Sequence, residues 1–327
     1  MIGEYPTPLQ NWSFTLRGKE YQMFIKREDL CDMEGSGNKL RKLQFILPDI
    51  LQGQHDWLVS LGSVQSNCCR TLSMIAAKHN FKCAHILITN PGYNTSSNEG
   101  NLYFHRLYGS KLFFFTRPEY YSRGHDVIVK EVLERLTKEH NAMKPYYVEM
   151  GGSTVRGLFA YVDCMKEIED QLEKLDLHPE HIFLGCGSGG TAAGLAIGKY
   201  LSKAPRLQNC KITSYLSCRK PEEFYDYVDE MLCLVGLGDE VKARQIITFV
   251  QAMGEGYALN TEEDLAIIKS VARSSGIILE GTYTVKALNH FLKEHEDGGG
   301  QGKALFIHTG GIFSTLGRED LLSVSIQ

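Results

Sequence analysis

The sequence lacks most of the features that mark metal sites, secretion and membrane insertion. None of its nine cysteines forms a Cys-x-x-Cys pair, and the adjacent Cys68 and Cys69 suit neither a tetrahedral metal site nor an ordinary disulfide. No apolar run is long enough to span a bilayer, and residues 1–10 have neither the basic region nor the apolar stretch of a signal peptide. The net charge of −4, without a basic run, gives no reason to expect a nucleic-acid or membrane partner. We therefore expect a cytoplasmic protein with reduced thiols and no bound metal.

Apolar strand patterns alternate with helical patterns along the whole chain of 327 residues, which is long enough for two domains. Strands are predicted at 21–27, 55–61, 84–89, 111–116, 145–149, 181–184, 211–216 and 304–308. This alternation predicts an α/β fold with parallel sheets, in which ligands bind beyond the carboxyl ends of the strands. Glycine- and hydroxyl-rich clusters follow predicted strands at 62–63, 151–153, 185–191 and 309–311, so these segments are candidates for the site.

The segment 35–43, Gly-Ser-Gly-Asn-Lys-Leu-Arg-Lys-Leu, leads from a predicted strand into a predicted helix. Gly35 and Gly37 let the backbone come close to a bulky group, and Lys39 lies where the helix begins. A desolvated lysine amine is the usual protein partner of a carbonyl cofactor, because burial lowers its pKa and exposes a nucleophilic lone pair. The alternative is a solvated lysine in the first helical turn, so confirmation has to come from the rest of the chain.

Residues 185–191 form the strongest motif, a glycine-rich turn between a predicted strand and a predicted helix. Backbone N–H groups at such a turn bind an anion, and Ser188 and Thr191 can add hydroxyl donors. The motif also fits Gly-x-Gly-x-x-Gly, but the next strand ends without a carboxylate, so a dinucleotide would be NADP held through Arg219. No Walker lysine follows, and Cys186 stands where Gly-x-Ser-x-Gly hydrolases have their first glycine. A single phosphate monoester is the preferred ligand, with NADP and a purely structural turn as alternatives.

Two further helix starts carry polar side chains at strand ends. Ser66 is expected to cap the helix that follows it, and its position would also let its hydroxyl and the Asn67 amide face a ligand. Tyr283 and Thr284 open a helix near the C-terminus, where core packing and capping are the simplest roles. Four histidines show no metal-ligand spacing and are expected to be structural, namely His79, His85, His105 and His308.

Together these segments resemble one group of pyridoxal-phosphate (PLP) enzymes of fold type II, which holds 1-aminocyclopropane-1-carboxylate deaminase and D-cysteine desulfhydrase. The resemblance rests on Gly-Asn-Lys-x-Arg-Lys-Leu at 37–43, Lys-Arg-Glu-Asp at 26–29 and Val-Gln-Ser-Asn at 64–67. Pro-Thr-Pro-Leu at 6–9, Gly-Ser-Gly-Gly-Thr at 187–191 and Tyr283 also fit, in the same order along nearly the whole chain.

For the fold, the resemblance implies a tryptophan synthase β-like architecture with two parallel-sheet, three-layer domains. Residues 1–44 plus 154–327 would form a large PLP-binding domain, and residues 45–153 a smaller inserted α/β domain. A homodimer is implied by the family alone.

For the site, the resemblance implies a role for each candidate residue. Lys39 would hold PLP covalently and later move protons at the substrate Cα, and Asn67 would bond the phenolic oxygen of the cofactor. The cofactor phosphate would bind, with charge added by Lys42, to Gly187, Ser188, Gly189, Gly190 and Thr191. Gln65 and Ser66 would meet the carboxylate of a small amino-acid substrate, and Tyr283 would lie beside the reacting centre.

Two positions favour the desulfhydrase over the deaminase. The deaminase is expected to carry a glutamate directly after the tyrosine and a leucine at position 309, where this chain has Thr284 and Thr309. Hydroxyls there would hydrogen-bond to substrate and cofactor instead of charging the site. We therefore expect α,β-elimination from D-cysteine, in which Lys39 removes the Cα proton, sulfide leaves, and pyruvate and ammonia result.

Three alternative functions stay open, and two segments differ from the pattern of the family. The first alternative stays within PLP chemistry and is either the deaminase, which would give 2-oxobutyrate and ammonia, or an eliminating enzyme for another D-amino acid. The others are an NADP-dependent oxidoreductase and a binding protein without turnover. The departures are Glu-Gly-Thr at 280–282, where the family usually has Asp-Pro-Val, and the unfamiliar segment 220–237. Both departures concern the substrate more than the cofactor.

Overall fold

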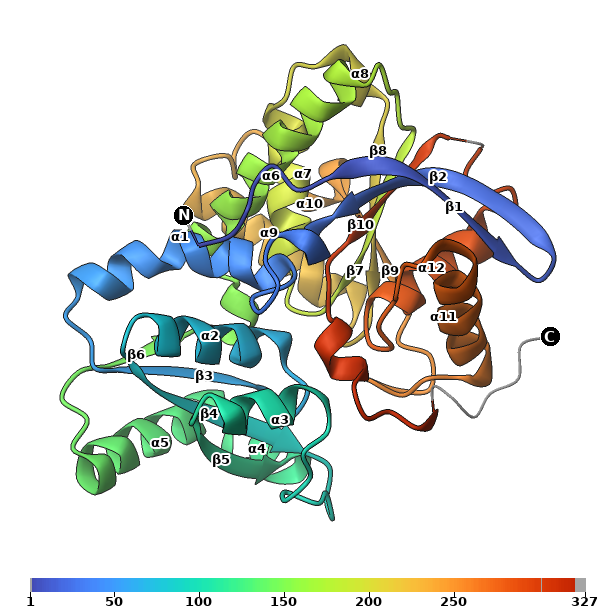
Figure 1. Ribbon diagram of the computed structural model, residues 1–327. Coiled ribbons are helices and arrows are strands. Elements are labelled where there is room, and N and C mark those ends of the chain that lie inside the picture. Colours follow the sequence, from blue (N-terminus) through green and yellow to red (C-terminus); the bar gives the residue numbers. More distant parts are fainter. Residues whose placement is uncertain (1, 301, 321–327) are drawn as a thin grey trace.

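The computed structural model describes residues 2–300 and 302–320, which form two β-sheets (Figure 1). The first sheet has the strand order β1 (Leu9–Leu16), β2 (Lys19–Arg27), β10 (Ala304–His308), β7 (His181–Cys186), β8 (Lys211–Leu216) and β9 (Thr248–Gln251). The second sheet has the order β5 (Lys111–Thr116), β4 (Lys82–Thr89), β3 (Trp57–Ser63) and β6 (Pro145–Val148). All the strands predicted from the sequence are present, so the α/β fold class is confirmed.

The described strands pair in parallel everywhere except between β1 and β2. These two form an antiparallel hairpin in which Leu9 lies opposite Lys26 and Leu16 opposite Lys19. The expected parallel pairing is confirmed for the other described strands, but β1 and its antiparallel pairing were not predicted, because the proline-containing start of the chain indicated only an extended lead-in. Strand β9 was also missed, since its four residues have exposed side chains at both ends and form no apolar run.

Helices cover both faces of the first sheet. On one face lie α6 (Val155–Lys174), α7 (Gly190–Leu201), α9 (Pro221–Leu234) and the short α8 (Pro205–Gln208) and α10 (Ala243–Ile246). On the other face lie α11 (Glu262–Ser275) and α12 (Thr284–Glu294). In β7, Ile182 and Leu184 belong to the first core and Phe183 to the second, so the strand is apolar on both faces. Such a strand is stable only between two helical layers, which gives the three-layer arrangement.

The second sheet is also covered on both faces. Helices α1 (Asn38–Gln52) and α2 (Asn67–Lys78) share a core with Leu58 of β3, whereas α5 (His125–His140) shares one with Val59. The shorter α3 (Gly100–Leu107) and α4 (Arg117–Arg123) connect the remaining strands. Three 3₁₀ turns, η1 (Glu28–Leu30), η2 (Met150–Gly152) and η3 (Ile312–Thr315), follow β2, β6 and β10. None of the helices within the described ranges combines the length and the apolar character needed to cross a membrane.

The strands of the second sheet all lie between residues 57 and 148, inside the segment 45–153 that the sequence analysis treats as an inserted domain. Helix α1 runs without a break across the predicted boundary between residues 44 and 45. It packs into the core of the second sheet and also against α6 of the first. The division of the chain at that point therefore stays a prediction.

Candidate active site

Hydrogen bonds bring together the segments that follow β6, β7 and β10. Ser153, after β6, donates from Oγ to Oγ of Ser188, after β7, at 2.7 Å. The N–H of Asn38 donates to the carbonyl oxygen of Thr309, after β10, at 3.0 Å, and its Nδ2 donates to Oγ1 of Thr191 at 2.9 Å. Carboxyl ends of strands from both sheets therefore surround the start of α1, which is where ligands bind in parallel α/β folds.

Lys39 is the second residue of α1, and the turn before it requires glycine. Gly37 has φ 105°, and a Cβ at that position would lie 2.7 Å from the carbonyl oxygen of Thr309. Across residues 2–300 and 302–320, Nζ of Lys39 has neither a hydrogen-bond nor an ion-pair partner. Burial lowers the pKa of this amine below its ordinary value. A lowered pKa favours the uncharged form of the amine, whose lone pair reacts with an aldehyde.

Lys42 lies one helical turn after Lys39 and is fully buried. Its Nζ donates to the carbonyl oxygen of Gly151 and to Oγ of Ser153, both at 3.1 Å. Burial, and then the neighbouring charge of Lys39, hold the pKa of Lys42 well below its usual range. In the described part of the chain neither lysine pairs with a carboxylate. A fully buried amine next to a partly buried one, neither with a counter-charge among the described residues, is an arrangement that an anion would stabilise.

The glycine turn that follows β7 has no room for side chains. A Cβ on Gly189 would lie 2.7 Å from the ring of Tyr227, and one on Gly190 would lie 2.8 Å from Nζ of Lys42. Helix α7 begins at Gly190, so the unpaired N–H groups of its first turn lie beside the Lys42 amine. Main-chain donors and a lysine amine therefore lie together at this turn, which is the set of donors that a phosphate group requires.

Ser66, Asn67 and Gln65 lie together at the start of α2, but they are used differently. Oγ of Ser66 accepts from the main-chain N–H three residues further on at 3.2 Å, so it caps the helix as predicted and keeps its own proton for a ligand. Oδ1 of Asn67 accepts from Nδ2 of Asn101 at 2.8 Å, which orients the Asn67 amide. Both polar atoms of the Gln65 side chain are hydrogen-bonded within the protein. Its Oε1 accepts from the N–H of Asn101 at 2.8 Å, and its Nε2 donates to the carbonyl oxygen of Glu99 at 3.1 Å. Its predicted contact with substrate stays a prediction, beside an evident role in fixing the turn before α3.

Tyr283 lies over the glycine turn and is hydrogen-bonded to a second tyrosine. A Cβ on Gly187 would be 2.6 Å from the Tyr283 ring, and the hydroxyl oxygens of Tyr283 and Tyr257 are 2.8 Å apart. The Tyr257 hydroxyl is also 3.4 Å from Oγ of Ser63, at the end of β3. Burial raises the pKa of both phenols, so both can donate a proton at neutral pH. Sequence reasoning missed Tyr257, because it lies in an irregular segment and belongs to no motif.

Glu280 and Thr284 together cap α12. Oγ1 of Thr284 accepts from the N–H of Glu280 at 2.7 Å and donates to its carbonyl oxygen at 3.1 Å. The Glu280 carboxylate accepts from the N–H groups of residues 282, 283 and 284 at 2.7, 2.5 and 2.8 Å, while burial raises its pKa. The Thr284 hydroxyl is thus occupied within this turn, whereas the side chain of Thr309 has no hydrogen-bond partner in the described ranges. Of the two threonines, Thr309 is the one whose hydroxyl is available to a ligand.

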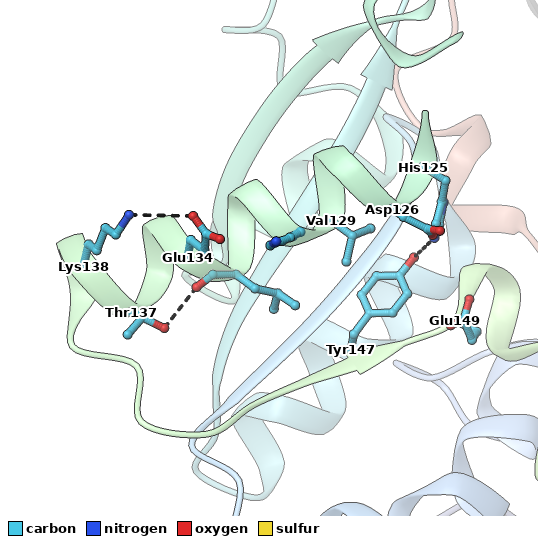
Figure 2. Close-up of a pocket in the computed structure, with 10 residues that line it drawn as sticks. His125, Asp126, Val129, Glu134, Thr137, Lys138, Tyr147 and Glu149 are labelled. Atoms are coloured by element: carbon cyan, nitrogen blue, oxygen red, sulfur yellow. Dashed lines mark hydrogen bonds and ion pairs between the residues drawn. The ribbon is translucent and has the colours of Figure 1, made fainter. Parts of the chain in front are cut away.

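A separate groove of about 540 Å³ lies between α5 and β6 (Figure 2). Its lining includes Val129 and Glu134 from α5 and Tyr147 from β6, whose hydroxyl is 3.2 Å from Nε2 of His125. None of the residues predicted for the site lines this groove. No cluster of side chains able to hold a metal ion occurs among the residues with described positions.

Comparison with known proteins gives a consistent assignment. A family model described as "Pyridoxal-phosphate dependent enzyme" matches residues 1–310. The chain is 34% identical over 331 residues to the mitochondrial bifunctional D-cysteine desulfhydrase/1-aminocyclopropane-1-carboxylate deaminase of Arabidopsis thaliana, with 98% of this chain and 80% of that protein covered. The crystal structure of an ACC deaminase homologue matches with a TM-score of 0.80 and 27% identity, over 98% and 94% of the two chains. A hydrogen sulfide-producing enzyme from Fusobacterium nucleatum shares the fold, with a TM-score of 0.61 and 15% identity over 93% and 95%.

Proposed function

The chain belongs to the family of pyridoxal-phosphate dependent enzymes, and we propose that it catalyses α,β-elimination from a small D-amino acid, with D-cysteine as the best candidate. The balanced reaction converts D-cysteine and water to pyruvate, sulfide and ammonia. The observation that carries the proposal is the pair of amines, the partly buried Lys39 and the fully buried Lys42, beside a glycine turn that also carries the Ser188 hydroxyl. An NADP enzyme would instead need Arg219 at this turn, yet that guanidinium is stacked on the ring of Phe224 at 4.6 Å.

The residues present fit PLP, which, when bound, supplies an electron sink for negative charge that develops at the substrate Cα. Lys39 would hold the aldehyde carbon of the cofactor through its amine. Lys42, Ser188, Thr191 and the first-turn N–H groups of α7 would bind the phosphate. Asn67, oriented by Asn101, would donate to the phenolic oxygen, and Thr309 would offer its hydroxyl to the cofactor ring.

The same residues account for the steps on the substrate. The Ser66 hydroxyl, at the N-terminus of α2, would bind the substrate carboxylate, which fixes the Cα–H bond relative to Lys39. Lys39 would accept the Cα proton, because burial lowers the pKa of its amine and so favours the form that can accept a proton. Tyr283, neutral and bonded to Tyr257, would donate a proton to the leaving sulfur.

Substrate choice rests on Thr284 and Thr309, which stand where the deaminase is expected to have glutamate and leucine. A buried hydroxyl at these positions adds no charge beside the cofactor, which favours elimination of a thiol over opening of a cyclopropane ring. The deaminase remains the second candidate, because the Arabidopsis relative is named for both activities and the structural match is an ACC deaminase homologue.

A substrate panel tests the proposal. The purified protein with PLP is incubated separately with D-cysteine, L-cysteine, D-serine and 1-aminocyclopropane-1-carboxylate, and sulfide, pyruvate and 2-oxobutyrate are measured. We expect sulfide and pyruvate in equal amounts from D-cysteine. If 2-oxobutyrate from the cyclopropane is the only product, the deaminase is the correct function.

Two variants connect the activity to the lysines. Lys39→Ala should lose both turnover and the visible absorption of the covalently held cofactor. Lys42→Ala should keep that absorption at high PLP concentration but require much more PLP for half-saturation, because it removes only a charge beside the phosphate. Equal behaviour of the two variants would contradict the assigned roles.

The homodimer expected from the family and the cytoplasmic location expected from composition are further parts of the proposal. The Arabidopsis relative is named as mitochondrial, so location has to be measured in cells of the source organism. Light scattering of the purified holoenzyme gives the oligomeric state directly.

A further inference from the structure

We propose that Arg117 is a positioning residue that holds the loop of residues 253–260 across the active site and thereby keeps Tyr257 bonded to Tyr283. The proposal rests on the proposed function for the role of Tyr283 but predicts a property of the loop that can be measured without turnover. Arg117 begins α4, beside the second sheet, whereas the loop joins β9 to α11 beside the first. The contact therefore connects an element beside the second sheet to a loop beside the first.

The loop is anchored at both ends by its own side of the molecule. At its start, Nζ of Lys286 donates to the carbonyl oxygen of Met253 at 2.8 Å. At its end, the amide of Asn260 packs on Gly281, where an added Cβ would lie 2.5 Å away. Tyr257, at the centre of the loop, lies between these anchors.

One residue of the loop, Ala258, has an unfavourable backbone conformation. Gly254 has φ 64°, Gly256 has φ 155°, and Ala258 has φ 61°. Glycine adopts such angles readily, but a residue with a Cβ does so only where neighbouring contacts hold it. Contacts outside the loop are therefore needed to keep this conformation.

Those contacts come from residues at the ends of second-sheet strands. The guanidinium carbon of Arg117 lies 5.5 Å from the centre of the Tyr257 ring, within the range of a cation–π interaction. Nε of Arg117 donates to Oδ1 of Asn90, after β4, at 2.7 Å, which fixes the guanidinium over the ring. Oγ of Ser63, at the end of β3, is 3.4 Å from the Tyr257 hydroxyl and adds a weaker contact.

Loss of the Arg117 contact would let the loop open. Tyr257 would then leave the hydroxyl of Tyr283, and water would reach the proton that Tyr283 is proposed to donate. Arg117 does not touch the reacting atoms in this scheme. It acts only through Tyr257, as a positioning residue.

Opening of the loop can be measured by proteolysis, because the exposed Glu255 in the loop is a cleavage site for a glutamate-specific protease. The holoenzyme and its variants are digested under limiting conditions, and the fragment that ends at Glu255 is quantified by mass spectrometry. Arg117→Ala should be cleaved there about fivefold faster, equivalent to about 1 kcal/mol in the opening equilibrium. Arg117→Lys should be intermediate, because a lysine keeps the cation but not the planar contact.

Arg123→Ala is the matched control. Arg123 lies on the same helix, its guanidinium is 5.6 Å from the ring of Phe115 in β5, and it pairs with Glu131 in α5, so neither contact reaches the loop. This variant should be cleaved at Glu255 at the wild-type rate. If Arg117→Ala is cleaved no faster than Arg123→Ala, the proposal is wrong.

Two further measurements separate the possible outcomes. Asn90→Ala, an exposed substitution that removes only the support of Arg117, should accelerate cleavage in the same direction and decides the question if Arg117→Ala does not fold. In the sulfide assay, Arg117→Ala should lower kcat with little change in KM for D-cysteine. Faster cleavage together with a wild type that releases no sulfide would support the loop contact and refute the proposed reaction instead.

Discussion

The buried carboxylate of Glu28 offers a quantitative test of what holds the lysine helix in place. Its oxygens accept from Nε and Nη2 of Arg41 at 2.7 and 2.8 Å, from Oγ1 of Thr7 at 2.6 Å and from the hydroxyl of Tyr161 at 2.8 Å. Arg41 also pairs with Glu167 at 2.9 Å and lies in the same turn of α1 as Lys39. Replacing Glu28 by glutamine keeps the shape but removes the charge and presents an amide to donors.

The magnitude follows from the pKa of Glu28. Burial alone would raise this pKa, but the charge and hydrogen bonds of Arg41 outweigh burial and lower it from 4.5 to about 2. Since a tenfold change in proton affinity corresponds to about 1.4 kcal/mol, the ionised carboxylate contributes about 3 kcal/mol to folding at pH 7. Breaking one partner of a buried ion pair costs about 3–5 kcal/mol in other proteins. We expect Glu28→Gln to lose about 3 kcal/mol of unfolding free energy.

The pH dependence has a definite sign. A group with a lowered folded pKa stabilises the protein above its unfolded pKa of about 4.5, and this contribution is lost as the pH falls toward 2. The difference between wild type and Glu28→Gln should therefore shrink by about 1 kcal/mol between pH 7 and pH 4. Urea unfolding of the cofactor-free proteins, followed by circular dichroism at both pH values, measures it.

The matched control is Glu139→Gln. Glu139 is exposed and pairs with Arg135 at 3.2 Å on the surface of α5, so its loss should cost about 0.5 kcal/mol or less. The reasoning is refuted if Glu28→Gln costs no more than Glu139→Gln. A loss of the same size at pH 4 and pH 7 would show that packing, not charge, is responsible.

Three further predictions concern the second sheet and the site. His85 and His105 are buried, and burial lowers the pKa of both, that of His85 to about 3. Below about pH 6.5, the free energy of unfolding should therefore fall by about 1.4 kcal/mol for each pH unit and each histidine. Urea titrations between pH 7 and pH 5.5 should show half this slope in His85→Gln, and a flat profile would contradict the prediction. Gly151→Ala should abolish PLP binding measured by absorbance, because φ is 70° and the new Cβ would lie 2.3 Å from Oγ of Ser188 in the glycine turn. Its control is Gly124→Ala, with φ 85° and nothing within 4 Å of the new Cβ, which should cost only about 1 kcal/mol of stability and leave binding unchanged. Tyr283→Phe should retain PLP but release sulfide at least 100-fold more slowly, and near-normal release would exclude the phenol as the proton donor.

Local patterns were enough to predict most of the architecture. The apolar spacing that defines strands and helices is a property of neighbouring residues, so the strands at 111–116, 211–216 and 304–308 were predicted with the bounds the structure has. The sequence also predicted the glycine turn after β7 and the glycine-containing segment before Lys39, because close approach of backbones and positive φ both require glycine. What local patterns did not contain was β1, whose place depends on pairing with β2, and β9, whose edge position allows it to be short.

The sequence by itself determined the elements and the residue types of the site, since both depend on short stretches of chain. Only the tertiary structure decided how those residues are used. It paired Tyr283 with Tyr257, 26 residues away, oriented Asn67 through Asn101, and committed Gln65 to the turn before α3. The physical reason is that a hydrogen bond requires donor and acceptor to be about 3 Å apart, and which strand ends come that close is decided by sheet order.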